Sequence, residues 1–271
     1  MNFDTHDCSA IITGASSGLG AEFARQLAPK ARCLVLVARR LEALEEVKRE
    51  LLRLKPTLGV HLVVADLGSE TGRVDLVEWV RQSEVRPDLL INNAGLGDYG
   101  ALVDATAEKL RMQIEVNVSA VVLLTHALLP VLRANAPAGI VNVSSLASTL
   151  PMPDMAVYAA SKAFVTSFSE GIAIELEPLG IQVTCVSPGP TPTNFSKTAK
   201  RADGTDTNRD GQGLLRIPSS QVVAEALAGL RAGKTCVFPG LGVSIAGPLF
   251  RHLPRLLMRW FLRRRHAGGK V

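Results

Sequence analysis

Residues 8–20 have the sequence Cys-Ser-Ala-Ile-Ile-Thr-Gly-Ala-Ser-Ser-Gly-Leu-Gly. They connect a short apolar run to a stretch with helical periodicity that extends to about Ala28. The run predicts a buried strand, and the helix is expected from about Ser17. The glycines between them let the backbone approach a ligand closely, and the helix N-terminus offers N–H groups and the positive end of its dipole. The turn therefore predicts a site for the phosphates of a dinucleotide. Its GxxxGxG spacing differs from the commoner GxGxxG fingerprint, so a glycine-rich turn without a ligand remains an alternative on this motif alone.

The rest of the chain repeats this alternation of short apolar runs and amphipathic stretches of helical length. Such alternation predicts right-handed β-α-β units, and therefore an α/β fold: a doubly wound parallel sheet of the Rossmann type, with about seven strands and helices on both faces. Ligands of such sheets bind beyond the carboxyl ends of the strands. Strands are expected at 8–13, 34–37, 60–65, 89–91, 139–145, 181–186 and 235–238, and helices at 17–28, 41–54, 70–83, 107–133, 155–177 and 219–232.

The composition suits one large domain with a charged extension. The 271 residues are 47% hydrophobic, which is enough for a substantial core. We expect residues 1–240 to form a single domain, including a substrate loop at 190–218, and residues 241–271 to form a basic, amphipathic C-terminal extension. The net charge of +5 is concentrated in this extension, which has seven Lys and Arg residues and no acid. The nearly neutral body offers no surface for a nucleic acid.

The location and redox state of the protein are predicted from its cysteines and its first residues. Each of the four cysteines lies in or beside an apolar run, as buried strand residues do, and no CxxC pair or Cys/His cluster indicates a metal. Residues 1–7 are polar and contain no apolar signal segment, so a cytoplasmic, reduced protein is expected. The weakly charged stretch Val116 to Leu132 contains several polar residues and suits a buried helix better than a membrane span.

Tyr158 and Lys162 lie four residues apart in a predicted helix, so their side chains project from one face. A lysine ammonium beside a phenol favours the phenolate, which would let Tyr158 exchange a proton far below its ordinary pKa of about 10. The same spacing arises by chance in many helices, where the tyrosine is partly buried and the lysine is solvated. The other motifs of the chain decide between the two interpretations.

Five motifs in the order and spacing of one family favour catalysis. Together they resemble the short-chain dehydrogenase/reductase family of nicotinamide-dependent oxidoreductases, in its NADP(H)-preferring type, over residues 8 to about 240. The motifs are Thr13-Gly-Ala-Ser-Ser-Gly-Leu-Gly20, Asn92-Asn-Ala-Gly95, Asn117, Ser145 with Tyr158-x-x-x-Lys162, and Pro188-Gly189 followed by Thr193.

The resemblance implies four catalytic positions. Tyr158 would be the general acid in carbonyl reduction and the base in alcohol oxidation. Ser145 would hydrogen-bond the substrate oxygen, and Ser144 fits less well because the family places its serine thirteen residues before the tyrosine. Lys162 would bind the nicotinamide ribose and stabilise the phenolate, and Asn117 would hold a water that connects Lys162 to solvent.

The resemblance also implies the positions of the cofactor, which would supply the hydride. Asp66 and Leu67 would contact the adenine, residues 93–95 the adenosine ribose, and residues 188–191 the carboxamide. The prolines on both sides of Thr191 depart from the family pattern and stiffen this turn. The predicted cofactor-binding residues are Gly14, Ser16, Ser17, Gly18, Leu19, Gly20, Arg39, Arg40, Asp66, Leu67, Asn93, Ala94, Gly95, Tyr158, Lys162, Pro188, Gly189, Thr191 and Thr193.

The end of the second predicted strand indicates which nicotinamide cofactor is preferred. An acid there would bind the ribose 2′-hydroxyl of NAD(H) and repel a 2′-phosphate. This chain instead has Ala38-Arg39-Arg40, and Arg39 can stack on the adenine and pair with a phosphate, while Ser16 can add a hydroxyl. The alternative, two solvated arginines at a helix start, is disfavoured because cations there oppose the helix dipole. NADP(H) is therefore the expected cofactor.

The substrate pocket should be lined by residues that follow the strands and by the loop 196–213, which would order over a bound substrate as a lid. Mostly apolar walls predict a ketone, aldehyde or acyl derivative instead of a charged sugar acid. The predicted lining is Ser145, Leu96, Leu146, Met152, Met155 and Phe195.

Residues 248–266 follow a basic amphipathic pattern, with arginines recurring every four residues beside a leucine face. Pro254 would start or kink the helix. Three interpretations are open: docking on the protein's own cleft or subunit interface, peripheral contact with an anionic membrane surface, and nucleic-acid binding.

Two functions are compatible with these motifs. The first is an NADP(H)-dependent carbonyl reductase or alcohol dehydrogenase that acts on a small molecule, and the resemblance implies that it is a homo-oligomer, a dimer or tetramer, built through helices 107–133 and 155–177. The alternative is a noncatalytic NADP(H)-binding regulatory or membrane-associated scaffold on the same fold. Such proteins usually lose the tyrosine or the lysine, and this chain keeps both.

Overall fold

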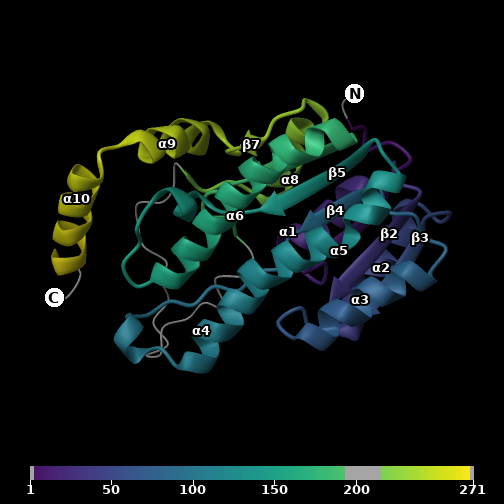
Figure 1. Ribbon diagram of the computed structural model, residues 1–271, viewed down its shortest axis with the longest axis horizontal. Coiled ribbons are helices and arrows are strands. Elements are labelled where there is room, and N and C mark those ends of the chain that lie inside the picture. The colour runs from purple at the N-terminus through teal and green to yellow at the C-terminus, as the bar shows by residue number, and fades with distance from the viewer. Residues whose placement is uncertain (1–2, 193–214, 269–271) are drawn as a thin grey trace.

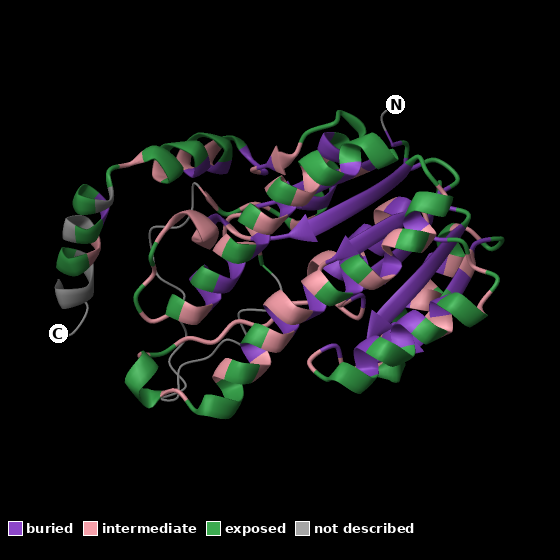
Figure 2. Cartoon of the chain, in the orientation of Figure 1, coloured by how far each residue is buried: buried purple, intermediate pink, exposed green. Residues whose placement is uncertain are grey.

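A computed structural model describes residues 3–192 and 215–268. It confirms the predicted sheet, in which seven parallel strands lie in the order β3-β2-β1-β4-β5-β6-β7 (Figure 1). Strands β1, β2, β4, β5 and β6 are almost entirely buried because helices cover both faces, whereas the edge strand β3 is partly exposed (Figure 2). The strands are β1 (Ser9–Thr13), β2 (Cys33–Ala38), β3 (Gly59–Val64), β4 (Leu89–Asn92), β5 (Ala138–Val143), β6 (Ile181–Val186) and β7 (Cys236–Val237).

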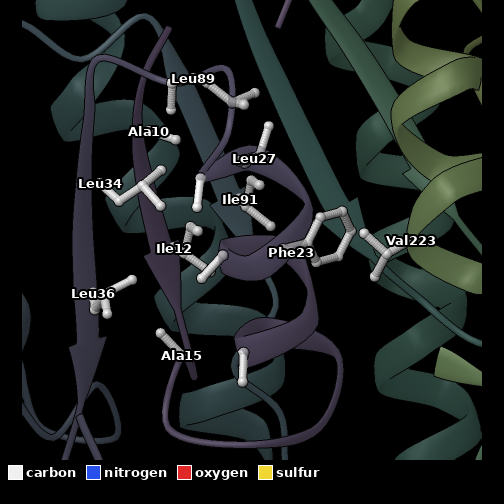
Figure 3. Packing of buried hydrophobic residues seen from close by; sticks show 14 of the residues in the cluster. Ala10, Ile12, Ala15, Phe23, Leu27, Leu34, Leu36, Leu89, Ile91 and Val223 are labelled. Carbon is white, nitrogen blue, oxygen red and sulfur yellow. The ribbon is translucent and has the colours of Figure 1, made fainter. Parts of the chain in front are cut away.

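The two faces of the sheet carry separate hydrophobic cores, because successive strand residues point to opposite sides. On β1, Ala10 and Ile12 pack toward α1 (Gly18–Leu27), α2 (Leu41–Leu54) and α8 (Ser219–Arg231). Phe23 of α1 lies between this strand and Val223 of α8 (Figure 3). Ile11 points the other way, toward α3 (Glu70–Gln82), α5 (Ala120–Ala134) and the end of α6 (Ala156–Leu176).

The long helix predicted at 107–133 runs from Ala107 to Ala134 with one irregular turn. It consists of α4 (Ala107–Ile114), a π-helical turn (Glu115–Ser119) and α5. By length and composition alone it could cross a membrane, but its inner face is part of the second core. This packing agrees with the expectation of a core helix.

Two crossovers determine where a ligand can lie. The first half of the chain winds from β1 outward to β3, and the second half returns to pair β4 with the other side of β1. The connections therefore diverge between β1 and β4, and a crevice opens beyond the carboxyl ends of these two strands.

The C-terminal extension forms two helices, α9 (Leu241–His252) and α10 (Arg255–Gly268). The second begins directly after Pro254, which was predicted to start or kink the helix at 248–266. The periodicity did not reveal that α9 begins at Leu241. In Figure 1, α10 projects from the body at the end of the molecule remote from β2 and β3.

Candidate functional site

The glycine turn at the end of β1 leaves no room for a side chain at Gly14 or Gly20. Gly14 has φ +66°, and a Cβ there would lie 2.9 Å from the Cα of Ala94. A Cβ on Gly20 would lie 2.2 Å from the carbonyl oxygen of Gly14. These two glycines allow the turn to pack directly on the segment that follows β4.

The segment after β4 holds this turn in place. The side-chain amide of Asn93 donates to the carbonyl oxygens of Thr13 at 2.8 Å and Gly14 at 3.3 Å. The Thr13 hydroxyl in turn accepts from the backbone N–H groups of Asn93 and Ala94. The side chain of Asn93, expected at the adenosine ribose, thus braces the turn.

The N-terminus of α1 fits an anionic group. Ser17 is the N-cap residue, its side chain makes no capping hydrogen bond, and the first turn contains no acid. The first N–H groups of a helix have no partner within it, and the helix dipole adds positive potential there. Ser16, Ser17, Gly18 and Leu19 are partly exposed, so the observed turn suits the pyrophosphate of a dinucleotide.

Two arginines lie beside this turn at the end of β2. The backbone N–H of Ala15 donates to Val37, which places the turn against the strand. Arg39 and Arg40 are exposed, and neither forms an ion pair with another described residue. They fit the 2′-phosphate that distinguishes NADP(H). At the end of β3, Leu67 is buried and a carboxylate oxygen of Asp66 accepts from the N–H of Gly68 at 3.0 Å.

Tyr158 and Ser145 form the centre of the second half of the site. Tyr158 is in the first turn of α6, is 8% exposed, and is hydrogen-bonded to the side chain of Ser145. Ser145 stands at the start of a 3₁₀ turn, Leu146–Thr149, where its Oγ also accepts from the N–H of Ala147. The neighbouring Ser144 is buried and donates to the carbonyl oxygen of Lys162, so it anchors α6 to the sheet.

The protonation of Tyr158 differs from the sequence expectation, which was a phenolate favoured by Lys162. Burial raises the pKa of Tyr158 above its usual range, and the hydrogen bond to Ser145 only partly offsets this. The phenol therefore remains protonated at neutral pH, which is the form a general acid requires.

Lys162 lies one turn after Tyr158 on α6 and is 4% exposed. Its Nζ donates to the carbonyl oxygen of Val143 at the end of β5, at 2.8 Å. Burial lowers the pKa of Lys162 to about 8, and the charge of Cys185 partly offsets this shift. The ammonium is thus held in place at the edge of the sheet where ligands bind.

Asn117 lies in the π-helical turn and is fully buried. Its side chain accepts from the N–H of Leu96 and donates to the Leu96 carbonyl oxygen, both at 2.8 Å, and also donates to Ser161. A Cβ on Gly95 would come within 3.3 Å of the Lys162 Nζ and 3.4 Å of the Asn117 Oδ1. Gly95 therefore separates the two side chains that were expected to share a proton path.

The segment after β6 provides the next wall. Pro188 is buried, and Thr191 donates to the carbonyl oxygen of Gly189 at 3.1 Å. A Cβ on Gly189 would lie 2.5 Å from the carbonyl oxygen of Leu215. Thr193, Phe195 and the loop 196–213 lie outside the described residues.

A cavity of about 260 Å³ reaches Tyr158. Met155 lines it as expected, whereas Leu96, Leu146 and Met152 do not. Leu96 is held by Asn117, and Leu146 is buried beside Ser145. The cavity is lined instead by Asp98, Gly100, Ala101, Leu102, Ala105, Leu110, Gln113, Pro153, Asp154, Ala156 and Val157, together with Met155 and Tyr158.

Several of these residues had no signal in the sequence. Gln113 on α4 donates to Leu96, and Ser161 connects Asn117 to the carbonyl oxygen of Tyr158. The N–H of Gly100 bonds the carbonyl oxygen of Asp154, which joins two loops distant in sequence. In the described part of the chain, no group of His, Cys, Asp and Glu side chains could hold a metal ion.

A phosphate-binding turn at the switch point of a doubly wound sheet, beside an acid and a buried ammonium, is the arrangement of a nicotinamide-dependent oxidoreductase. The family model of short chain dehydrogenases matches residues 9–204. The chain therefore belongs to the short-chain dehydrogenase/reductase family and is an enzyme of the oxidoreductase class.

Individual relatives agree with this assignment. The chain is 39% identical over 225 residues to sulfoacetaldehyde reductase of Chromohalobacter salexigens, covering 81% of this chain and 86% of that protein. It is 37% identical over 224 residues to dehydrogenase/reductase SDR family member 7B of Bos taurus, covering 79% and 69%. The structure resembles a short-chain dehydrogenase from Sphingobium yanoikuyae in complex with NADPH, with a TM-score of 0.78, 29% identity, and coverage of 97% and 96%.

Proposed function

We propose that the protein transfers a hydride between NADP(H) and the carbonyl or alcohol group of a mostly apolar small molecule, with Tyr158 as general acid and base. The hydrogen bond between Tyr158 and Ser145 carries this proposal, because it joins a proton donor to a group that can hold a substrate oxygen. Lys162, on the same face of α6, completes the arrangement.

The roles of the side chains follow from their surroundings. Ser145 orients the substrate oxygen toward the phenol of Tyr158, which burial keeps protonated. When Tyr158 gives up its proton, the ammonium of Lys162 stabilises the phenolate and its N–H groups hold the ribose of the cofactor. Asn117 fixes the backbone of Leu96 and thereby the loop beside Gly95. When bound, the cofactor supplies or accepts the hydride.

NADP(H) is proposed as the cofactor on two grounds. Arg39 and Arg40 place cations at the end of β2, where an NAD-binding protein would have an acid. Several similar solved structures of the family contain NADPH or NADP.

The cavity beside Tyr158 favours an uncharged substrate. Ala101, Leu102, Ala105, Leu110 and Val157 give it apolar walls. Asp98 and Asp154 also line it, and Asp98 is paired with Lys109 at 3.9 Å. We therefore propose a neutral ketone, aldehyde or acyl derivative.

The test is a panel of ketones and aldehydes, followed by the absorbance of NADPH and repeated with NADH. Tyr158→Phe should reduce kcat by at least about a hundredfold while NADPH binding is retained, because a phenyl ring cannot donate a proton. The matched control is Tyr99→Phe, which changes the other tyrosine of the chain and should keep the activity. Turnover by Tyr158→Phe at the normal rate would contradict the mechanism. NADPH binding without any turnover in the unaltered protein would favour the scaffold.

We also propose that the enzyme is a cytoplasmic homo-oligomer. The described cysteines are free thiols, which suits a reducing compartment. Phe164 and Ile174 on α6 and Leu123 on α5 are exposed by 42%, 77% and 49%, and a partner subunit would cover them.

A further inference from the structure

We propose that α9 and α10 form a docking surface for an anionic lipid bilayer, which keeps the substrate site close to the membrane. The docking itself is independent of the proposed function. Its consequence, that the carbonyl substrate is lipophilic and enters from the bilayer, rests on that function.

An apolar row on α9 is the first observation. Leu241, Ile245 and Leu249 are exposed by 80%, 63% and 57%, and their spacing of four residues places them on one face of the helix. Val243 and Gly247 are buried on the body. Figure 2 shows this division into a buried and an exposed side along α9. Isolated exposed leucines are ordinary, but an aligned row on one helix marks a binding surface.

The apolar surface continues on α10, where it is joined by positive charge. Leu256 and Leu257 are exposed by 79% and 58%. Arg259, Arg263 and Arg264 are also exposed. Residues 241–271 contain no acid, and Arg251 of α9 forms an ion pair with Glu170 on α6.

Charge decides which partner this surface fits. An anionic bilayer attracts arginines and accepts leucine side chains at the boundary between headgroups and acyl chains. A second copy of the same helices would bring like charges together without an acid to offset them. Nucleic acid would satisfy the arginines but would leave the apolar row of α9 in water.

The buried face of α9 forms part of the active-site wall. The Cγ2 of Val243 would lie 2.8 Å from a Cβ on Gly189, in the segment predicted to hold the nicotinamide. The helix also packs on the 3₁₀ turn that follows Ser145. A membrane bound to the outer face of α9 therefore lies on the side of the molecule where the substrate is held.

Flotation of the full-length protein with lipid vesicles tests the docking. We expect binding to vesicles with about 30 mol% phosphatidylglycerol, at least tenfold weaker binding to pure phosphatidylcholine, and release at about 0.5 M salt. Replacing Leu241, Ile245 and Leu249 by Ser should weaken binding at least tenfold, as should Arg259, Arg263 and Arg264→Gln. The matched control is Leu54, Val64 and Val74→Ser, three exposed apolar residues on α2, β3 and α3, which should leave binding unchanged.

NADPH binding by each variant verifies that it is folded. No binding of the unaltered protein to anionic vesicles at low salt would overturn the proposal, as would equal binding by the α9 variant. Loss of an oligomer in the α9 variant, without vesicle binding by the unaltered protein, would assign the surface to a second subunit instead.

With an active enzyme, anionic vesicles should lower the KM for a long-chain ketone at least threefold and should not change the KM for a water-soluble ketone. Vesicle binding by a protein that reduces no carbonyl would overturn the proposed function and leave the docking intact.

Discussion

Lys162 carries a buried charge. Its ammonium is 4% exposed and has one neutral hydrogen-bond acceptor, the carbonyl oxygen of Val143, so its pKa falls to about 8. Burial moves the pKa of Tyr158 upward instead, above its usual range. As pH rises, the lysine therefore loses its proton before the tyrosine does.

This order predicts the pH dependence of cofactor binding. Lys162 is charged below about pH 8 and neutral above it, so the Kd for NADPH should rise above pH 8 by up to about tenfold per pH unit. Arg39 keeps its charge throughout this range. Titration of NADPH fluorescence between about pH 7 and 9.5 measures the effect. Lys162→Met should bind more weakly at pH 7 and show no change with pH. A constant Kd in the unaltered protein would contradict the prediction.

The residues differ in how far the sequence revealed their roles. The spacing to Tyr158 favoured Ser145 over Ser144 as the serine that binds the substrate oxygen. In the structure, the Ser144 hydroxyl donates to the backbone of α6. The bonds of Asn93 to Thr13 and Gly14 could not be predicted, because they join two segments about eighty residues apart. The raised pKa of Tyr158 was also missed, because burial depends on the packed fold.

At the scale of elements, alanine substitutions of two helical glycines should change the free energy of unfolding in opposite directions. Gly20→Ala in α1 should lower the free energy of unfolding by about 2 kcal/mol and weaken NADPH binding, because its Cβ meets the backbone of Gly14 at 2.2 Å. Gly171→Ala in α6 should raise the free energy of unfolding by about 1 kcal/mol, because no atom lies within 4 Å of the added Cβ and alanine favours the helix. Urea unfolding of both variants gives the comparison. Stabilisation by Gly20→Ala would show that the turn can relax.

Asp88 connects the starts of three strands and carries a second stability prediction. Its carboxylate accepts from the N–H of Ser9 at 2.9 Å, and its carbonyl oxygen accepts from Gly139. Burial raises its pKa to about 6, although the bond from Ser9 opposes this, so ionisation destabilises the folded state as pH rises from about 4 to 6. Asp88→Asn should therefore raise the free energy of unfolding at pH 7 by about 1 kcal/mol, after allowance for partial exposure. The gain should vanish near pH 3, where the carboxyl is largely protonated in both states, and a gain that persists there would contradict this cause.

The elements themselves were largely predictable, because apolar runs and 3.6-residue periodicity determine parallel strands and their covering helices. Two features were not. The π-helical turn around Asn117 keeps the helical pattern of α4 and α5 and so leaves no mark on the periodicity. The start of α9 was missed because its exposed leucines resemble a buried face until the packing is known.

At the scale of the whole molecule, the exposed apolar residues of α5 and α6 predict self-association. Changing Phe164 and Ile174 to Glu should convert the oligomer to a monomer, because each charge would be buried in the interface. Light scattering after size-exclusion chromatography measures the mass. The vesicle-binding control variant, with Leu54, Val64 and Val74 changed to Ser, should keep the oligomer. A monomeric unaltered protein would refute the prediction.

The brace between Asn93 and the glycine turn also determines the order of events during folding. Strand β1 pairs with β4, so the turn at Gly14 reaches its final form only after a segment about eighty residues further along has been synthesised and has crossed to its side. Such distant contacts fold slowly, because a long loop must close before they form. On the ribosome, the first βαβ unit therefore emerges without a finished nucleotide site. The cofactor can stabilise the completed fold, but it cannot guide the first half of the chain into place.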